Sequence, residues 1–152
     1  MNQSNQISLL NPLLVGIGTI FCTIIIHGLI LGMIIHLVRR DLRLGRAGVR
    51  FRIDLLIVAG AMMMALIAHL IEIGLWAVVL NFCGRFSTFA AAFYHSAGNY
   101  TTIGDSTALM SSRWRLLGPL EASDGMLMFG ISTAMIFAVV QRLIQTRYGP
   151  RD

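Results

Sequence analysis

The sequence predicts an all-helical integral membrane protein with three membrane-spanning helices. Hydrophobic residues make up 56% of the 152 residues and charged residues only 12%, a balance unlike that of a soluble domain. The apolar residues gather in three long runs, 13–38, 53–82 and 119–144. At about 1.5 Å per residue, each run can cross a hydrocarbon core of roughly 30 Å. The first run is longer than the apolar core of a signal peptide, so we expect it to be retained.

Arginines set the predicted orientation in the membrane. All twelve basic residues are arginines, and six of them lie in residues 39–52, between the first two runs. A short loop this basic is expected to stay cytoplasmic, together with the arginine-containing end of the third run. The N-terminus then lies outside and the C-terminus in the cytoplasm of a multi-pass protein of the cell (inner) membrane. We also expect Arg39 to Arg52 to meet anionic lipid headgroups.

A shorter segment separates the second and third runs. Residues 87–100 favour a helix that Ser87 or Thr88 can cap, but about fourteen residues span only roughly 21 Å. Such a helix can enter a bilayer and cannot cross it. Non-helical backbone at membrane depth must be buried in protein or line a water-filled cavity. The sequence therefore predicts a re-entrant helix and loop that four subunits enclose around one axis, with a plain extracellular loop as the alternative.

The loop after this helix carries a recognisable motif. It reads Tyr-Thr-Thr-Ile-Gly-Asp-Ser over residues 100–106, and Trp114 and a glycine-containing span follow it. This order resembles the pore module of tetrameric potassium channels, in which the loop reads Thr-Thr-(Val, Ile or Leu)-Gly-Tyr-Gly-Asp and its carbonyls replace the water shell of the ion. The resemblance covers residues 69–145, and the chain is similar to small bacterial ion-channel proteins that place one extra span before the outer helix.

The resemblance implies two parts and a set of ion-binding residues. Residues 1–52 would form the extra span and the basic loop, and residues 53–152 the pore module of a homotetramer without enzyme activity or a cofactor. The implied parts of the pore module are the outer helix 53–82, the pore helix 87–100, the filter 101–106 and the inner helix 119–145. The implied filter residues, which bind the permeant cations, are Thr101, Thr102, Ile103, Gly104, Asp105 and Ser106.

The filter departs from the potassium pattern at two positions. Asp105 stands where the family has tyrosine, and Ser106 stands at the second glycine. Serine reaches positive φ less easily than glycine, so the outer carbonyl rings should be lost or rearranged. Four Asp105 carboxylates near the axis would form an acidic ring that gathers cations. The expected function is weakly selective conduction of K⁺ and Na⁺; a potassium-selective or Ca²⁺-permeable channel is the alternative, as is a capping role for Asp105.

The third run carries the predicted pore-lining residues. At spacings of three and four, Met126, Phe129, Thr133 and Phe137 share one face of a helix. In the family this face lines the aqueous cavity and forms the gate, and the alternative is packing against neighbouring helices. Glycine at position 125 or 130 is the predicted hinge of the inner helix.

Ionisable residues inside the apolar runs mark the remaining candidates. His69 and Glu72 are three residues apart on one helical face, which predicts a hydrogen-bonded pair that locks the second span in place, with a proton or ion relay as the alternative. His27 and His36 should lie on opposite faces of the first span.

Two further readings concern acidic residues and histidines. Glu121 and Asp124 are expected near the outer mouth, where they would attract cations or pair with arginines 113 and 115. Four histidines in apolar helices also allow a different class, a haem-binding or structural membrane protein without conduction.

Overall fold

The computed structural model describes residues 3–84, 86–104 and 113–149, which form four helices and no strand. The helices are α1 (Gln3–Arg43), α2 (Phe51–Cys83), α3 (Phe89–Tyr100) and α4 (Leu117–Tyr148). Three segments are long and apolar enough to cross a membrane, Leu9–Arg43, Phe51–Cys83 and Leu117–Tyr148. The all-helical class and the three candidate spans are therefore confirmed.

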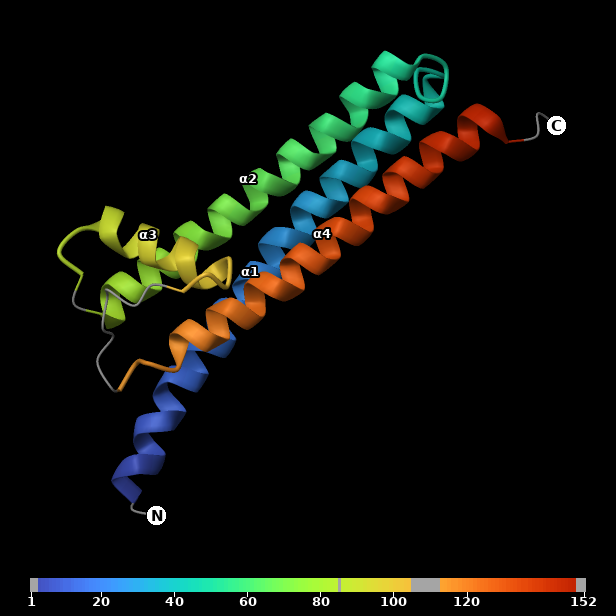
Figure 1. Ribbon diagram of the computed structural model, residues 1–152. Helices are drawn as coiled ribbons and strands as arrows, with labels where there is room; N and C mark the ends of the chain where they lie inside the picture. The colour runs from blue at the N-terminus through green and yellow to red at the C-terminus, as the bar shows by residue number, and fades with distance from the viewer. Residues whose placement is uncertain (1–2, 85, 105–112, 150–152) are drawn as a thin grey trace.

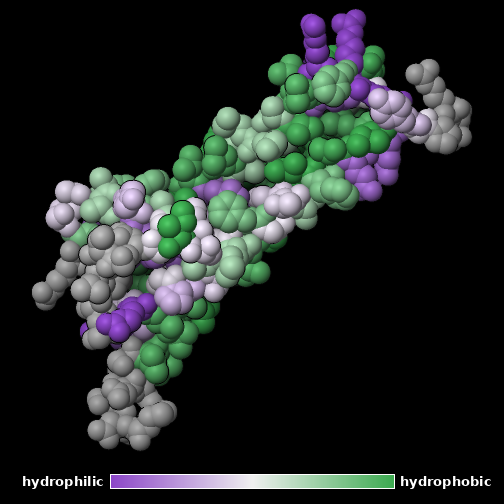
Figure 2. All heavy atoms as spheres, in the orientation of Figure 1, coloured by the Kyte–Doolittle hydropathy of each residue, from purple (hydrophilic) through white to green (hydrophobic). Residues whose placement is uncertain are grey.

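The three long helices lie side by side along most of their length (Figure 1). The connection between α1 and α2 and the end of α4 lie at one end of the bundle, and α3 lies toward the other end, against α2 and α4. We call these the basic end and the α3 end. Hydrophilic residues gather at the basic end, while apolar residues cover much of the length of the bundle (Figure 2). Helices α2, α3 and α4 begin and end within three residues of the predicted outer, pore and inner helices, whereas α1 is longer than the predicted run 13–38, by ten residues at its start and five at its end.

Thr88 caps the start of α3, and it is one of the two caps, Ser87 or Thr88, that the sequence predicts. Its backbone is extended, with φ −146° and ψ 156°, and its hydroxyl oxygen accepts a hydrogen bond from the backbone N–H of Ala91 at 3.2 Å. This bond satisfies one of the amides that the first turn of a helix leaves without a partner. The helix is twelve residues long, and it ends where the Thr-Thr-Ile-Gly motif begins.

The core of the bundle has two clusters of buried apolar side chains. At the basic end the buried members are Ile34, Val38, Ala47, Ala61, Val139 and Leu143. Toward the α3 end they are Ile73, Trp76, Leu80, Tyr100, Leu117 and Met128. From the first cluster toward the second, Ala61, Ala65 and Ala68 give α2 a face of small residues at spacings of four and three. Small side chains let helix backbones approach closely, which favours helix association within a bilayer.

Candidate functional site at the α3 end

Directly after α3, backbone amides of the chain donate hydrogen bonds back to the last turn of the helix. The N–H groups of Thr101, Thr102 and Gly104 donate to the carbonyls of Ala97, Asn99 and Gly98 at 3.1, 2.9 and 2.9 Å. Among the described residues, no backbone amide donates to the carbonyls of Thr101 to Gly104. All four of these residues are exposed. Within the described part of the chain, the turn therefore has a short row of carbonyl groups without a backbone hydrogen-bond partner.

Two positions of this turn have a left-handed backbone. Gly104 has φ 74°, a conformation that glycine adopts without steric cost. Thr102 has φ 63°, which is uncommon for a β-branched residue and stores strain. Strained backbone of this kind is concentrated at functional sites. Asp105 and Ser106, the other two predicted filter residues, lie outside the described residues.

The predicted stripe on α4 is exposed in the single chain. Phe137, Met126 and Phe129 are 65, 58 and 39% exposed, and Thr133 is exposed as well. The Thr133 hydroxyl donates to the carbonyl of Phe129 at 2.8 Å, so its oxygen remains available on the helix surface.

The two predicted hinge glycines have different surroundings. A Cβ atom at Gly125 would lie 2.1 Å from the carbonyl oxygen of Tyr100, so this glycine allows α4 to touch the end of α3. A Cβ atom at Gly130 would have no neighbour within 4 Å. Position 125 is thus occupied by glycine for a packing reason, whereas Gly130 has no such reason and stays the better candidate for a hinge.

Five polar side chains from all four helices form a closed ring next to this turn. Glu72 lies 2.8 Å from Nδ1 of His27 through Oε1, and its Oε2 accepts a short hydrogen bond from the hydroxyl of Tyr100. That hydroxyl lies 3.2 Å from Nδ1 of His69. Ser132 closes the ring, because its Oγ lies 3.1 Å from Nε2 of both histidines. Each of the five side chains is at most 6% exposed as a residue.

The ring extends the predicted His69–Glu72 pair. His69 Nδ1 lies 3.5 Å from Glu72 Oε2, so the two residues are neighbours, but Glu72 has its closer contacts with His27 and Tyr100. His27 is buried and His36 is exposed, in agreement with the predicted opposite faces of α1. Sequence reasoning missed His27, Tyr100 and Ser132 as partners of this pair. A tyrosine directly before the motif was the one available signal, since a buried tyrosine usually needs a partner for its hydroxyl.

Glu121 and Asp124 do not face the outside, and the expectation that they attract cations or pair with Arg113 and Arg115 is wrong. Both are fully buried. Asp124 accepts a hydrogen bond from Nε1 of Trp76 at 2.8 Å and contacts the Thr23 hydroxyl at 2.8 Å. The physical reason is the helical spacing, which turns these two carboxylates toward α1, α2 and α3.

Glu121 is the carboxylate that contacts α3. It accepts from the side-chain amide of Asn99 at 3.1 Å and meets the hydroxyl of Ser96, which also lies 2.8 Å from the carbonyl of Ile73. The carboxylates of α4 therefore hold α3 and α1 in place through neutral partners. A buried carboxylate requires such partners, because an isolated charge in an apolar interior is very costly.

The ring contains donor atoms that a metal ion or haem iron could use. One donor atom each from His27, His69 and Glu72 lies within 4.8 Å of the others. However, all four ring nitrogens of the two histidines already lie within 3.2 Å of Glu72, Tyr100 or Ser132. These are hydrogen-bond distances, and they leave neither histidine free to serve as an axial ligand. The arrangement is a hydrogen-bonded ring, and it does not support the haem alternative.

At the basic end the structure adds an ion pair that the sequence did not reveal. Arg147 near the end of α4 lies 2.6 Å from Oδ2 of Asp54 in the first turn of α2. The other oxygen of Asp54 accepts the backbone N–H of Gly48 at 2.7 Å, in the connection between α1 and α2. One carboxylate therefore joins three segments of this end.

Comparison with known proteins adds no relative. No family model matches the chain, and neither a curated protein nor a solved structure matches it significantly. The interpretation of this chain therefore depends on its own residues and their geometry.

Proposed function

We propose that this protein is a homotetrameric, weakly selective channel for monovalent cations. The observation that carries the proposal is the turn after α3, where residues Thr101 to Gly104 are exposed and their carbonyls accept no backbone hydrogen bond from a described residue. Rings of backbone carbonyls can replace the hydration shell of a cation. Four such turns around an axis would supply those rings.

The position of the turn favours a cation as its ligand. The last carbonyls of a helix carry a partial negative charge, and the turn continues directly from the C-terminal end of α3. An anion would be disfavoured at this end. A re-entrant α3 in a tetramer would point four helix C-termini at one axis, which strengthens the preference for cations.

The groups that one chain leaves exposed support a tetramer. A bilayer does not solvate free carbonyls, so the turn needs a water-filled cavity that is enclosed by protein. In this proposal the face of α4 with Met126, Phe129, Thr133 and Phe137 lines the cavity below the filter. Phe137 is the best candidate for a gate, because an exposed phenyl ring in each subunit would give an apolar constriction that closes by dewetting.

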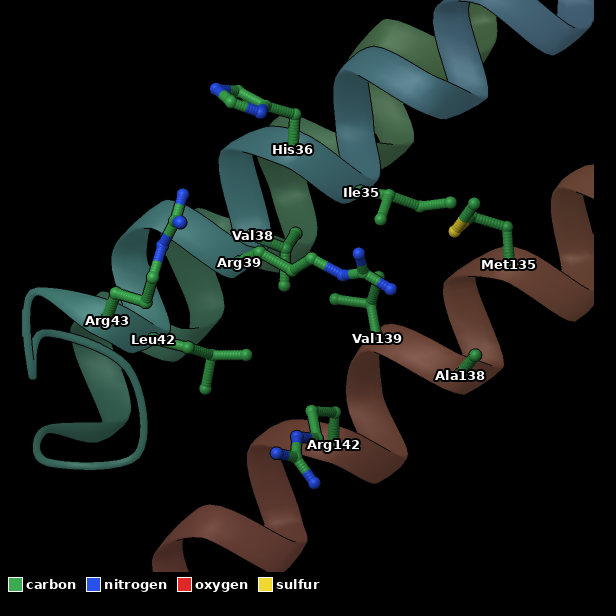
Figure 3. A pocket seen from close by; sticks show the side chains of 10 residues that line it. All are labelled: Ile35, His36, Val38, Arg39, Leu42, Arg43, Met135, Ala138, Val139 and Arg142. Atoms are coloured by element: carbon green, nitrogen blue, oxygen red, sulfur yellow. The ribbon is translucent and has the colours of Figure 1, made fainter.

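We propose an anionic membrane lipid as the partner of the basic end. A groove between α1 and α4 contains Arg39, Arg43 and Arg142 among apolar residues (Figure 3). The Arg39 side chain points from α1 toward Val139 of α4, and Arg142 follows Val139 on the same helix (Figure 3). A lipid phosphate would neutralise these guanidinium groups while an acyl chain covers the apolar wall. This agrees with the expected cytoplasmic position of residues 39–52.

Two measurements test the channel. The purified protein should have the mass of a tetramer in mild detergent and in lipid nanodiscs. In planar bilayers with K⁺ on one side and Na⁺ on the other, the reversal potential should show only a small preference for K⁺. A monomer in both environments, or no current above that of empty bilayers, would refute the proposal, and a strongly K⁺-selective current would refute its weak selectivity.

Two single-cysteine variants test which face of α4 lines the pore. In a background with Cys22→Ser and Cys83→Ser, Thr133→Cys should allow a water-soluble thiol reagent to block the current. The matched control is Ile131→Cys, which is also exposed but lies about 200° away around the helix. Block through residue 131 and not through residue 133 would place the conduction path on another face of α4.

A further inference from the structure

The ring of His27, Glu72, His69, Tyr100 and Ser132 has five hydrogen-bond contacts, and each contact requires one hydrogen. With Glu72 ionised and both histidines neutral, the ring contains only four hydrogens that can form these contacts. The tyrosine and the serine bring one each, and each neutral imidazole brings one. One contact would then be left with two acceptors facing each other. The closed geometry needs a fifth hydrogen.

One added proton satisfies every contact. If His27 carries it, its two N–H groups donate to Glu72 and to Ser132. The Ser132 hydroxyl then donates to His69, which donates to Tyr100, which donates to Glu72. The same proton can reside on another member if the direction of the bonds reverses. A sixth hydrogen would again break a contact, because two donors would then face each other.

The electrical charge favours the same state. With four hydrogens the ring has a net charge of −1, and with five hydrogens it is neutral. Glu72 is 0% exposed and His27 is 1% exposed. An unbalanced charge at such a depth is costly, whereas a neutral, fully bonded set of side chains is tolerated.

We propose that the ring is a binding site for one proton, shared among Glu72, His27 and His69, and that this proton holds the four helices together. Loss of the proton opens one contact of the ring. Because Tyr100 is both a member of the ring and the last residue of α3, the opening acts on the residue directly before Thr101. The site therefore senses pH next to the turn that we propose as the filter.

Neighbouring titratable groups have their own partners. On α4, Asp124 contacts Thr23 and Trp76, and Glu121 contacts Ser96 and Asn99. On α3, His95 is buried and its ring lies 5.3 Å from that of Phe86. None of these groups bonds a member of the ring in the hydrogen bonds described. Substitutions confined to the ring should therefore separate its titration from theirs.

Glu72→Gln provides the decisive variant. One N–H of the glutamine amide can donate to His27 while its oxygen accepts from Tyr100, so each of the five contacts has one hydrogen and the ring has no charge without any added proton. Its closed geometry should then be independent of alkaline pH. His36→Gln is the matched control, since it removes an exposed histidine of α1 outside the ring.

The first experiment is unfolding of the purified protein by a denaturing detergent between pH 7.5 and 9. In this range unfolded histidines are mostly neutral, so folding of the wild-type chain takes up one proton. The folding equilibrium constant should then fall about tenfold for each unit of rising pH, relative to Glu72→Gln. His36→Gln should behave like the wild type. Equal pH dependence in the wild type and Glu72→Gln would overturn the proposal.

A metal ion is the competing occupant of the ring. We expect elemental analysis of the purified protein to find no stoichiometric transition metal. Stoichiometric metal that disappears in His69→Asn would overturn the proton site, because the ion would then replace the fifth hydrogen.

The last experiment measures how the current depends on pH, and it is the only one of these experiments that rests on the proposed function. It therefore distinguishes failure of the proton site from failure of the channel. Tyr100→Phe removes the contact with α3 but lets Glu72 and His69, 3.5 Å apart, close a smaller ring. The variant should keep the alkaline loss of stability and should lose the pH dependence of its current. A pH-dependent current that survives in this variant would overturn the link to the filter. If no variant conducts while the pH-dependent stability persists, the channel fails and the proton site stands.

Discussion

The two ends of the bundle are held together by different kinds of contact. At the α3 end, buried polar side chains from four helices bond one another around Glu72, Glu121 and Asp124. At the basic end, apolar side chains such as Ile34 and Leu143 pack together, and one partly buried ion pair joins α2 to α4.

The difference shows which contacts can specify a structure inside a membrane. Lipid tails are as apolar as leucine, so apolar packing there has little hydrophobic driving force. A buried carboxylate, in contrast, tolerates few arrangements, since each of its oxygens needs a donor. The arrangement of helices should therefore be more strictly specified at the α3 end than at the basic end. The segment that we propose as the filter begins directly after α3, at this more strictly specified end.

The largest effect should come from Gly125→Ala. The new methyl group would collide with the backbone carbonyl of Tyr100, which a rotamer change cannot relieve. We expect a loss of about 3 kcal/mol of stability, or failure to fold, as for severe overpacking. Gly130→Ala is the control and should cost nothing measurable, because no atom lies near its added Cβ. Detergent unfolding curves of both variants measure the difference, and equal curves would contradict the close contact of α3 with α4.

An intermediate effect is expected for Trp76→Phe. The substitution removes the N–H that donates to Asp124 at 2.8 Å and leaves a buried carboxylate with one donor fewer. The expected cost is about 2 kcal/mol. Trp114→Phe is the matched control, since Trp114 is half-buried and contacts the Arg113 guanidinium instead of a carboxylate. If unfolding showed the same cost for both tryptophans, the polar contacts would not be what distinguishes the α3 end.

The smallest effect should appear at the basic end. Asp54→Asn keeps an oxygen for the Gly48 amide but removes the charge that faces Arg147, and we expect a loss of about 1 kcal/mol that shrinks in high salt. Asp41→Asn is the control, because Asp41 and Arg46 are 4.0 Å apart and more exposed. A loss for Asp54→Asn as large as that for Trp76→Phe would reverse the ranking of the two ends.

Sequence alone determined the features that depend on neighbours along the chain. The length and apolarity of three runs predicted the three candidate spans, and Ser87 or Thr88 was the predicted cap of α3, a role that Thr88 fills. Gly104 is the glycine that the sequence shares with the potassium-channel motif, and its φ is 74°. These features follow from helix length, capping and backbone sterics, which act within a few residues.

Tertiary structure alone decided which polar residues meet. His27, Glu72, Tyr100 and Ser132 belong to four different helices, and no periodicity within one helix shows that they share one ring. The prediction that Glu121 and Asp124 lie at the outer mouth failed for the same reason. A carboxylate near the end of a span can face water or bind a buried partner, and the local sequence is the same in both cases. Their partners lie on other helices, Ser96 and Asn99 of α3 for Glu121 and Thr23 of α1 and Trp76 of α2 for Asp124, because a buried polar group is fixed by donors that are distant in sequence.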